Sequence, residues 1–229
     1  MGCNMRFHPG VAHLKGALDA GALRRPLYFR AWFDHYLPNW RPGRDYRSSY
    51  SARRDQGGGI ILEGTHEIDY LRWLGGEITR VRAHAARLSD LEIDAEDYAS
   101  LTLEFESGAQ ARVELDCLSL LKVRGCEVVG AEGRLRWSSE GKAPETVRVL
   151  HWEGTQRVKE IYVSPAYDPN AMYLDEMRHF LGCIDGRCEP LLDLEQGCRV
   201  LEVVLAARRA AESGREVWRD VSRTRLVRG

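Results

Sequence analysis

Apolar and polar residues alternate over several short stretches in the middle of the chain, and this pattern constrains the fold more than any other. Alternation places apolar side chains on one face of a strand and polar side chains on the other, as in antiparallel sheets with one buried face. The stretches cover residues 78–85, 98–105, 111–115, 126–130, 134–137, 147–152 and 158–163. Ser107-Gly108 predicts a hairpin turn between the second and third. No helical pattern interrupts them, so we predict one mostly antiparallel sheet.

Helical patterns lie on both sides of this sheet region. Proline is favoured in the first turn of a helix, and aspartate and glycine are typical of helix starts and ends, so these residues mark the expected boundaries. The expected elements are a helix from Pro9 to Gly21, a strand over 27–33, a helix around residues 172–180, a helix from Asp193 to Gly214, and an edge strand at Val217-Trp218. We interpret Tyr173, Glu176 and Phe180 as a helix face that packs on the sheet, rather than as a site.

Composition excludes several classes of function. The 229 residues include 33 lysines and arginines against 34 aspartates and glutamates, so bulk charge gives no argument for binding nucleic acid or an anionic membrane. Six scattered cysteines form no C-x-x-C pair, and we expect neither a metal site nor disulfides. No apolar run approaches the ~20 residues that span a bilayer, and no signal peptide is evident, so we expect a soluble, cytoplasmic protein.

The segment Gly57-Gly58-Gly59 leads into a predicted helix that carries the most reactive residues of the chain. At about 100° per residue, one side of this helix is polar and aromatic and the opposite side is apolar. The first side holds Glu63, His66, Tyr70 and Trp73, and the second holds Ile60, Ile61, Ile68 and Leu71. A carboxylate three residues before a histidine can orient its ring and raise its pKa, which suits a general acid or base.

The spacing around His66 also allows two other interpretations. A histidine packed between helix and sheet and bonded to Glu63 or a backbone carbonyl fits the same spacing equally well. The residues His66-Glu67-Ile68-Asp69-Tyr70 also approach the zinc-protease pattern H-E-x-x-H, but the second histidine is absent, so we expect no zinc hydrolase.

The three glycines do not form a phosphate-binding loop, because neither G-x-G-x-x-G nor G-x-x-x-x-G-K-S/T occurs in the sequence. One explanation is close approach of the backbone at the start of a helix. The other is that free amides at Gly58 and Gly59 face a cofactor or an anionic group of the substrate.

An aromatic and arginine-rich loop, residues 36–50, precedes these glycines. It is long for a simple connection, and its aromatic rings and guanidinium groups suit sugar rings, bases, phosphates or carboxylates. We predict that it binds substrate, and the alternative is a loop that packs on its own aromatic side chains.

An ordered set of short motifs resembles the C-terminal domain of the Gfo/Idh/MocA family of NAD(P)-dependent oxidoreductases over nearly the whole chain. The motifs are Met5-Arg6-Phe7-His8-Pro9, Leu37-Pro38-Asn39-Trp40-Arg41-Pro42, Asp45-Tyr46-Arg47, Gly57-Gly58-Gly59, His66-Glu67-Ile68-Asp69-Tyr70, Glu96-Asp97 and Tyr173-x-x-Glu176. The resemblance implies an α+β fold, an open, mainly antiparallel sheet with helices on one face, like the C-terminal domain of glyceraldehyde-3-phosphate dehydrogenase. The resemblance is strongest to the members of the family that act on sugars and sugar nucleotides.

The resemblance also implies roles for particular residues. His66 would take part in proton transfer, and Glu63, where the family commonly has aspartate, would orient it. Cofactor contacts would come from Gly58 and Gly59. The implied substrate-binding residues are Arg6, Trp40, Arg41, Tyr46, Arg47 and Tyr70.

The family's nucleotide-binding Rossmann domain, with its glycine fingerprint and Glu-Lys-Pro lysine, has no counterpart in residues 1–229, which we expect to form a single domain. We therefore expect the chain to be the substrate-binding and oligomerisation part of an NAD- or NADP-dependent sugar or polyol dehydrogenase, inactive and unable to bind NADH tightly by itself. A separate nucleotide-binding domain is an expected partner. The alternative is a non-catalytic dimeric binding or assembly module. We expect dimers or tetramers through an exposed sheet face that carries Trp137 and Trp152.

Overall fold

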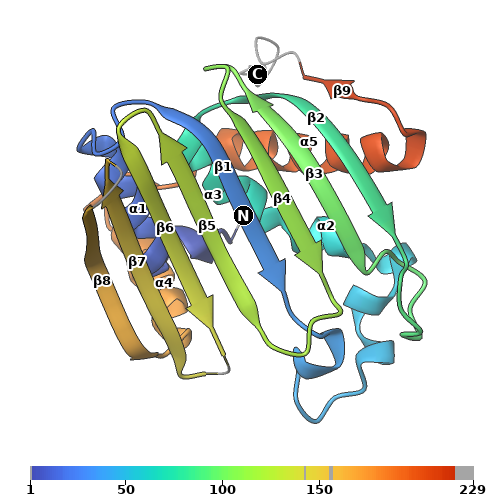
Figure 1. Cartoon of the computed structure of the whole chain (residues 1–229). Helices are drawn as coiled ribbons and strands as arrows, with labels where there is room; N and C mark the ends of the chain where they lie inside the picture. Colours follow the sequence, from blue (N-terminus) through green and yellow to red (C-terminus); the bar gives the residue numbers. More distant parts are fainter. Residues whose placement is uncertain (1, 142, 155–156, 220–229) are drawn as a thin grey trace.

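A single nine-stranded sheet forms the centre of the protein in a computed structural model that describes residues 2–141, 143–154 and 157–219. The strand order is β8-β7-β6-β5-β1-β4-β3-β2-β9 (Figure 1). All neighbouring strands are antiparallel except β1 and β4. The strands are β1 (Pro26–Asp34), β2 (Ile78–Ala86), β3 (Tyr98–Phe105), β4 (Gln110–Asp116), β5 (Val123–Gly130), β6 (Gly133–Glu140), β7 (Glu145–Glu153), β8 (Arg157–Tyr167) and β9 (Val217–Trp218). The predicted open, mainly antiparallel sheet is confirmed.

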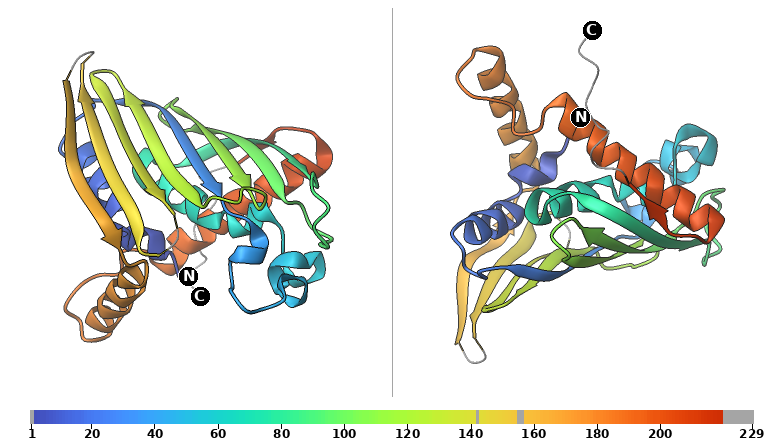
Figure 2. Two further views of the ribbon diagram at one scale, coloured as in Figure 1. Left: turned by 60° about the horizontal axis from the view of Figure 1, so that its bottom comes forward. Right: turned by 90° about the horizontal axis from the view of Figure 1, so that it is seen from above.

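Helices cover one face of the sheet and leave the opposite face bare (Figures 1 and 2). The helices are α1 (Pro9–Asp19), α2 (Ile60–Glu63), α3 (Thr65–Gly75), α4 (Asn170–Ile184) and α5 (Leu194–Ser213). α1 packs on β6 and β7, α3 on β1, and α5 on β2. The expected α+β class with helices on one face is confirmed. Among the described helices, none combines the length and apolar character needed to cross a membrane.

The alternation of the sequence determines which face of each strand is buried. In β4, Ala111, Val113 and Leu115 are buried beneath the helices, whereas Arg112 and Glu114 lie on the bare face. The hairpin between β3 and β4 turns at Gly108, whose φ of 80° is readily adopted only by glycine.

Trp137 does not lie on the bare face, so this part of the prediction is wrong. Its side chain is fully buried on the helix side of β6, where it contacts the rings of His8 and Tyr70. Alternation in β6 shows that Trp137 and Arg136 face opposite ways, but only the packed helices determine which way is inward. Trp152, by contrast, is partly exposed, and the Arg134 guanidinium lies over its ring.

The predicted continuous helix after the glycines is divided into α2 and α3 at Gly64. A Cβ atom on Gly64 would lie 2.4 Å from Leu115 Cδ1, so a glycine is needed where the chain passes close to β4. Tyr70, on the predicted polar and aromatic side, is fully buried. α3 is covered by the sheet on one side and by α1 and α5 on others, so both of its sides lose solvent.

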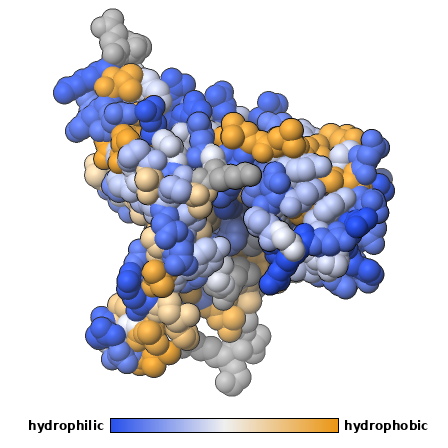
Figure 3. Space-filling view, turned by 90° about the horizontal axis from the view of Figure 1, so that it is seen from below, coloured by the Kyte–Doolittle hydropathy of each residue, from blue (hydrophilic) through white to orange (hydrophobic). Residues whose placement is uncertain are grey.

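Helix α4 projects away from the sheet instead of packing on it, which corrects the prediction for Tyr173 and Phe180 (Figure 2). The first turn of chain, the 3-10 helix Asn4–Phe7, is its main neighbour. Hydrophobic side chains remain exposed on this projecting helix (Figure 3). They are Tyr173, Leu174, Met177, Phe180, Leu181 and Ile184. The apolar spacing predicted the helix correctly, but spacing alone does not identify the surface that a helix contacts.

Candidate functional site

His66 lies in the first turn of α3, where the chain leaves α2. Burial, followed by the neighbouring Arg124 guanidinium, lowers the pKa of His66 from 6.5 to about 4. The prediction that Glu63 raises this pKa is therefore wrong, because desolvation and a nearby cation both disfavour the imidazolium form. Within the described residues, the buried Nδ1 atom of His66 has no hydrogen-bond partner.

Glu63, the last residue of α2, contacts the preceding loop. Its Oε2 atom accepts a hydrogen bond from the Tyr50 hydroxyl at 3.5 Å. Its other carboxylate oxygen, Oε1, is buried and has no partner in the part of the chain that the structure describes. Two buried polar atoms on residues three positions apart therefore lack a hydrogen-bond partner. Leaving such atoms without a partner lowers the free energy of unfolding, and a ligand could bond both.

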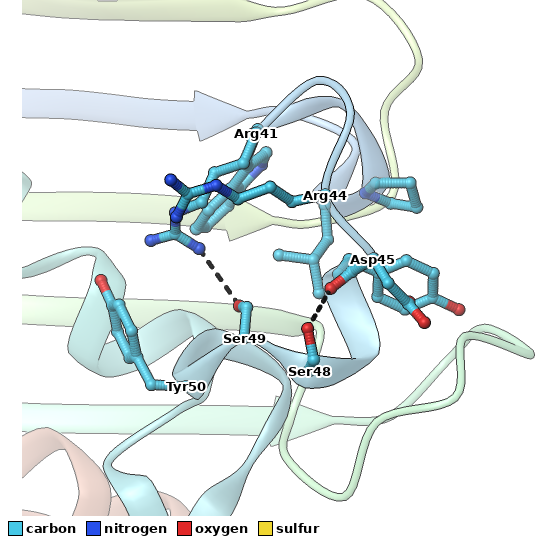
Figure 4. Close-up of a pocket in the computed structure, with 10 residues that line it drawn as sticks. Arg41, Arg44, Asp45, Ser48, Ser49 and Tyr50 are labelled. Carbon is cyan, nitrogen blue, oxygen red and sulfur yellow. Dashed lines mark hydrogen bonds between the residues drawn. The ribbon is translucent and has the colours of Figure 1, made fainter.

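The predicted binding loop encloses a cavity of about 280 Å³ (Figure 4). Trp40, Arg41 and Tyr46 line it, as the sequence predicted, together with Arg44 and Tyr50. The Arg41 guanidinium points toward Ser49 and Tyr50 in Figure 4. The loop thus forms a concave surface with guanidinium, hydroxyl and aromatic groups, the kind of lining that holds small polar molecules.

The loop also packs on its own aromatic side chains, so the two interpretations of it are compatible. The Trp40 indole N–H donates to the His35 carbonyl at 2.7 Å, and its ring stacks on His35 with centroids 6.0 Å apart. Arg41 Nη1 donates to Ser49 Oγ at 3.1 Å, and its guanidinium carbon lies 5.1 Å from the centre of the Tyr50 ring. These contacts hold the groups of the cavity in defined positions.

Two arginines predicted to bind substrate have partners within the chain. Arg47 lies outside the cavity, with its guanidinium bonded to Asp45 at 2.9 Å and to Glu92 at 3.2 Å. Arg6 is almost fully buried, and its guanidinium bonds Asp69 Oδ1 at 2.7 Å and the Leu191 carbonyl at 2.8 Å. The structure therefore places both guanidinium groups in ion pairs and not in the cavity.

Tyr70 also lies away from the cavity. Its hydroxyl donates to the Gly125 carbonyl at 3.2 Å, and its ring meets Trp137 edge to face. Because the side chain is fully buried against β5 and β6, it supports the site from within the core in this conformation.

The glycines at the start of α2 approach the chain itself. A Cβ on Gly58 would lie 2.4 Å from the Tyr50 carbonyl, and one on Gly59 would lie 2.4 Å from the Glu96 carboxylate. The amide of Ile60 donates to the Glu96 carbonyl at 3.0 Å. Close backbone approach accounts for these glycines, and the Gly58 amide is not free, because it donates to the Arg53 carbonyl at 2.8 Å.

An ion pair beneath His66 was not predicted from the sequence. Glu67 Oε1 accepts a hydrogen bond from Arg124 Nε at 2.6 Å, and Glu67 is fully buried. The partners lie on α3 and β5, far apart in the chain, so no local pattern could reveal them. Arg44 and Tyr50 could have been named, since they share the loop and the residue types of the predicted site.

The described residues do not form a dinucleotide site. Such a site needs parallel strands joined through a glycine-rich turn and a helix whose amide groups hold the pyrophosphate. The one parallel pair, β1 and β4, has no such connection in the described part of the chain, and Glu96 occupies the start of α2. The described residues therefore lack the strand–turn–helix unit that holds the pyrophosphate of a dinucleotide.

The chain matches a part of each of two longer proteins of known function. The chain is 28% identical over 231 residues to D-apiose dehydrogenase of Paraburkholderia graminis, covering 93% of this chain and 57% of that protein. It is 27% identical over 232 residues to scyllo-inositol 2-dehydrogenase (NAD(+)) of Bacillus subtilis, covering 97% and 63%. The chain thus spans less than two thirds of the length of both relatives.

The fold and the family follow from two further matches. The crystal structure of aldose-aldose oxidoreductase from Caulobacter crescentus superposes with a TM-score of 0.79 at 21% identity, covering 95% of this chain and 63% of that chain. Residues 11–136, more than half of the chain, match the model of the GFO/IDH/MocA C-terminal domain. The chain therefore belongs to the GFO/IDH/MocA family and contains the C-terminal domain of that family.

Proposed function

We propose that this chain is the substrate-binding and oligomerisation portion of an NAD(P)-dependent oxidoreductase that acts on a hydroxyl group of a sugar, sugar nucleotide or polyol. The observation that carries the proposal is the pair of unpartnered, buried polar atoms on consecutive helices, His66 Nδ1 and Glu63 Oε1. Ligand hydroxyl groups can satisfy both atoms, since a hydroxyl donates one hydrogen bond and accepts others.

The electrostatic environment of His66 suits a proton acceptor. With its pKa lowered to about 4, the imidazole is neutral at pH 7 and has a free lone pair. In this proposal His66 takes the proton of the reacting hydroxyl, and Glu63 positions the substrate. NAD or NADP, held by a nucleotide-binding domain, supplies hydride acceptance at its nicotinamide ring.

The cavity supplies groups that can hold the rest of a sugar-like substrate. The Trp40 and Tyr50 rings offer apolar faces, and Arg41 and Arg44 offer guanidinium donors. The Tyr50 hydroxyl bonds Glu63, so the lining of this cavity includes a residue in contact with one of the two proposed reactive side chains. Arg6, Arg47 and Tyr70 hold the surrounding structure in place in this scheme.

The names of the relatives support this substrate class. They include dehydrogenases of apiose, of scyllo-inositol and, as an NADP(+)-dependent enzyme of Haloferax volcanii, of D-xylose. All of these compounds are polyhydroxylated and uncharged, so hydroxyl groups are the common feature that a site can recognise.

The bare face of the sheet supports oligomerisation. It presents guanidinium groups over aromatic rings, with Arg30 5.4 Å from the Tyr28 ring and Arg136 5.3 Å from the Trp32 ring. Arginine and aromatic side chains are enriched at protein interfaces. The alternative function, a dimeric binding or assembly module without catalysis, rests on this same face and does not need His66.

A chimaera tests the proposal directly. The nucleotide-binding portion of the Bacillus subtilis relative would be joined in front of this chain, and NADH formation would be measured with inositols and pentoses. We expect turnover from the chimaera and neither turnover nor tight NADH binding from the isolated chain. His66→Ala should abolish turnover of the chimaera.

The matched control is His84→Ala, which removes an exposed histidine on β2 and should leave turnover unchanged. A folded chimaera that binds NADH but oxidises none of these substrates would contradict the proposal. If the isolated chain also forms a stable dimer by light scattering, the assembly module becomes the better description.

A further inference from the structure

A histidine and two cysteines meet at the end of the projecting helix α4. His179 and Cys183 lie on the helix, and Cys188 lies in the turn that follows. Cys183 Sγ is 3.7 Å from Cys188 Sγ and 3.6 Å from His179 Nε2, and Cys188 Sγ is 3.7 Å from His179 Nδ1. One ligand atom from each of the three residues lies within 4.8 Å of the others. From the sequence we expect no metal site at these cysteines, because they form no C-x-x-C pair, and His179 has no partner at a spacing that suggests shared chemistry.

The fold builds this cluster in three steps. His179 and Cys183 are four residues apart on one helix, so their side chains lie on the same face. Gly186, with a φ of 69°, ends the helix and reverses the chain toward it. Gly182 then leaves space for Cys188, since a Cβ at Gly182 would lie 3.1 Å from the Cys188 sulfur.

Two of the separations agree with the edges of a tetrahedral zinc site in which His179 Nε2 is the nitrogen ligand. With Zn–S bonds of about 2.3 Å and Zn–N bonds of about 2.0 Å, a tetrahedron has S···S edges of about 3.8 Å and S···N edges of about 3.5 Å. The sulfur–sulfur distance and the distance from Cys183 Sγ to His179 Nε2 are each within about 0.1 Å of these values. Thiolate and imidazole ligands are those that zinc prefers.

We propose that His179, Cys183 and Cys188 form a zinc-binding site with two sulfur ligands and one nitrogen ligand, which leaves a fourth position for water. Zn²⁺ would displace the protons of both thiols, which are released to solvent. If Nε2 of His179 is the nitrogen ligand, zinc replaces the hydrogen bond that this atom accepts from the Leu191 amide at 2.9 Å.

Such a site would tie the loop after α4 to the body of the protein. The Leu191 carbonyl accepts a hydrogen bond from Arg6, which is paired with Asp69 of α3. By joining Cys188 to α4, zinc would fix the start of the loop whose Leu191 carbonyl makes this contact, in place of the hydrogen bond between the Leu191 amide and His179.

The test uses the full chain, reduced with a phosphine that does not bind metal and freed of metal by dialysis. Titration with Zn²⁺ alone should show one ion bound per chain, and Co²⁺ should give the intense visible bands of a tetrahedral ion with thiolate charge-transfer absorption. His179→Ala, Cys183→Ser and Cys188→Ser should each weaken zinc binding by more than about 100-fold. The loss of a ligand lowers metal affinity more than the loss of a residue that only orients a ligand. Zinc should also raise the unfolding temperature of the parent chain and not of these variants.

Cys198→Ser is the matched control, since Cys198 is also partly exposed but lies outside the cluster, on α5. This variant should bind zinc as the parent chain does. The proposal is overturned if the reduced chain binds no zinc, or if binding survives in all three cluster variants. A reduced chain that ignores zinc but forms a Cys183–Cys188 disulfide on exposure to oxidant would also overturn it, and would identify the two sulfurs as a redox pair instead.

Discussion

The two helices α3 and α4 differ in how many of their side chains are buried and in how many of their charged groups are buried in ion pairs. Seven of the eleven residues of α3 are buried, including Glu67, Asp69 and Arg72, and these charged groups have partners of opposite sign. Only Met172 and Gly182 are buried among the fifteen residues of α4. Most of the large hydrophobic residues of α4 are exposed, and Asp175 and Arg178 form a surface ion pair.

The two helices therefore differ in what a substitution on them should change. α3 is held on several sides, so small changes in it should alter stability and the environment of His66. α4 is held mainly at its start, so changes on it should leave the isolated domain intact and affect only what binds there. The first two experiments below pair a change in or beside α3 with a matched change in α4, and the other two test one helix alone.

The largest difference is expected for the acidic residues. Asp69→Ala leaves the guanidinium of Arg6 buried without a counter-ion, which should lower the free energy of unfolding by about 3–5 kcal/mol. Asp175→Ala removes an exposed pair with Arg178 on α4 and should cost at most about 0.5 kcal/mol. Urea denaturation measures both values, and similar midpoints for the two variants would contradict the comparison.

A smaller difference is expected for glycines. Gly64→Ala places a methyl group 2.4 Å from Leu115 Cδ1, and the resulting overpacking should cost about 1–3 kcal/mol. Gly182→Ala meets only the Cys188 sulfur, at the end of an exposed side chain that can rotate, so the change should be within about 1 kcal/mol. The thermal unfolding midpoints should therefore fall for the first variant and change little for the second.

The pH dependence of stability isolates His66. The folded chain holds this imidazole neutral down to about pH 4, whereas the unfolded chain protonates it near pH 6.5. The contribution of His66 to stability is therefore complete above pH 6.5 and is lost as the pH falls toward 4. His66→Gln should flatten the stability profile over this window, and an imidazole NMR signal of His66 that titrates near pH 6.5 would show that the ring is not desolvated.

The smallest effect is expected at the end of α4. Ile184 is 65% exposed, so Ile184→Ser should change the free energy of unfolding of the isolated chain by no more than about 0.5 kcal/mol. A loss as large as that of a core substitution would mean that α4 folds back onto the sheet in solution.

Local patterns in the sequence identified most of the elements correctly. Asp193 caps α5 by accepting a hydrogen bond from the Gln196 amide, Gly214 follows its end with a left-handed conformation, and Val217–Trp218 is the edge strand. Each of these features depends on residues close together in the chain. The length of the loop over residues 36–50 and its aromatic and arginine content also identified the segment whose Trp40, Arg41 and Tyr46 line the cavity.

Features that depend on distant residues were not predicted. The pKa of His66 depends on burial and then on Arg124, and the position of Tyr70 in the core depends on Gly125 and Trp137. Trp137 was placed on the wrong face because alternation gives the spacing of buried residues but not the direction in which the helices lie. These relations exist only once the sheet has assembled.

The place of β1 in the sheet has a consequence for how the chain reaches its native state. The N-terminal strand lies between β4 and β5, so Tyr28 pairs with Gln110 on one side and Val129 on the other. These pairings join residues far apart in the chain, so on a ribosome the aromatic segment of β1 must wait until β4 and β5 have emerged. Chaperone capture during synthesis, and not only the stability of the finished fold, should therefore limit the yield of this domain, and nascent chains that end before β5 should be protease-sensitive.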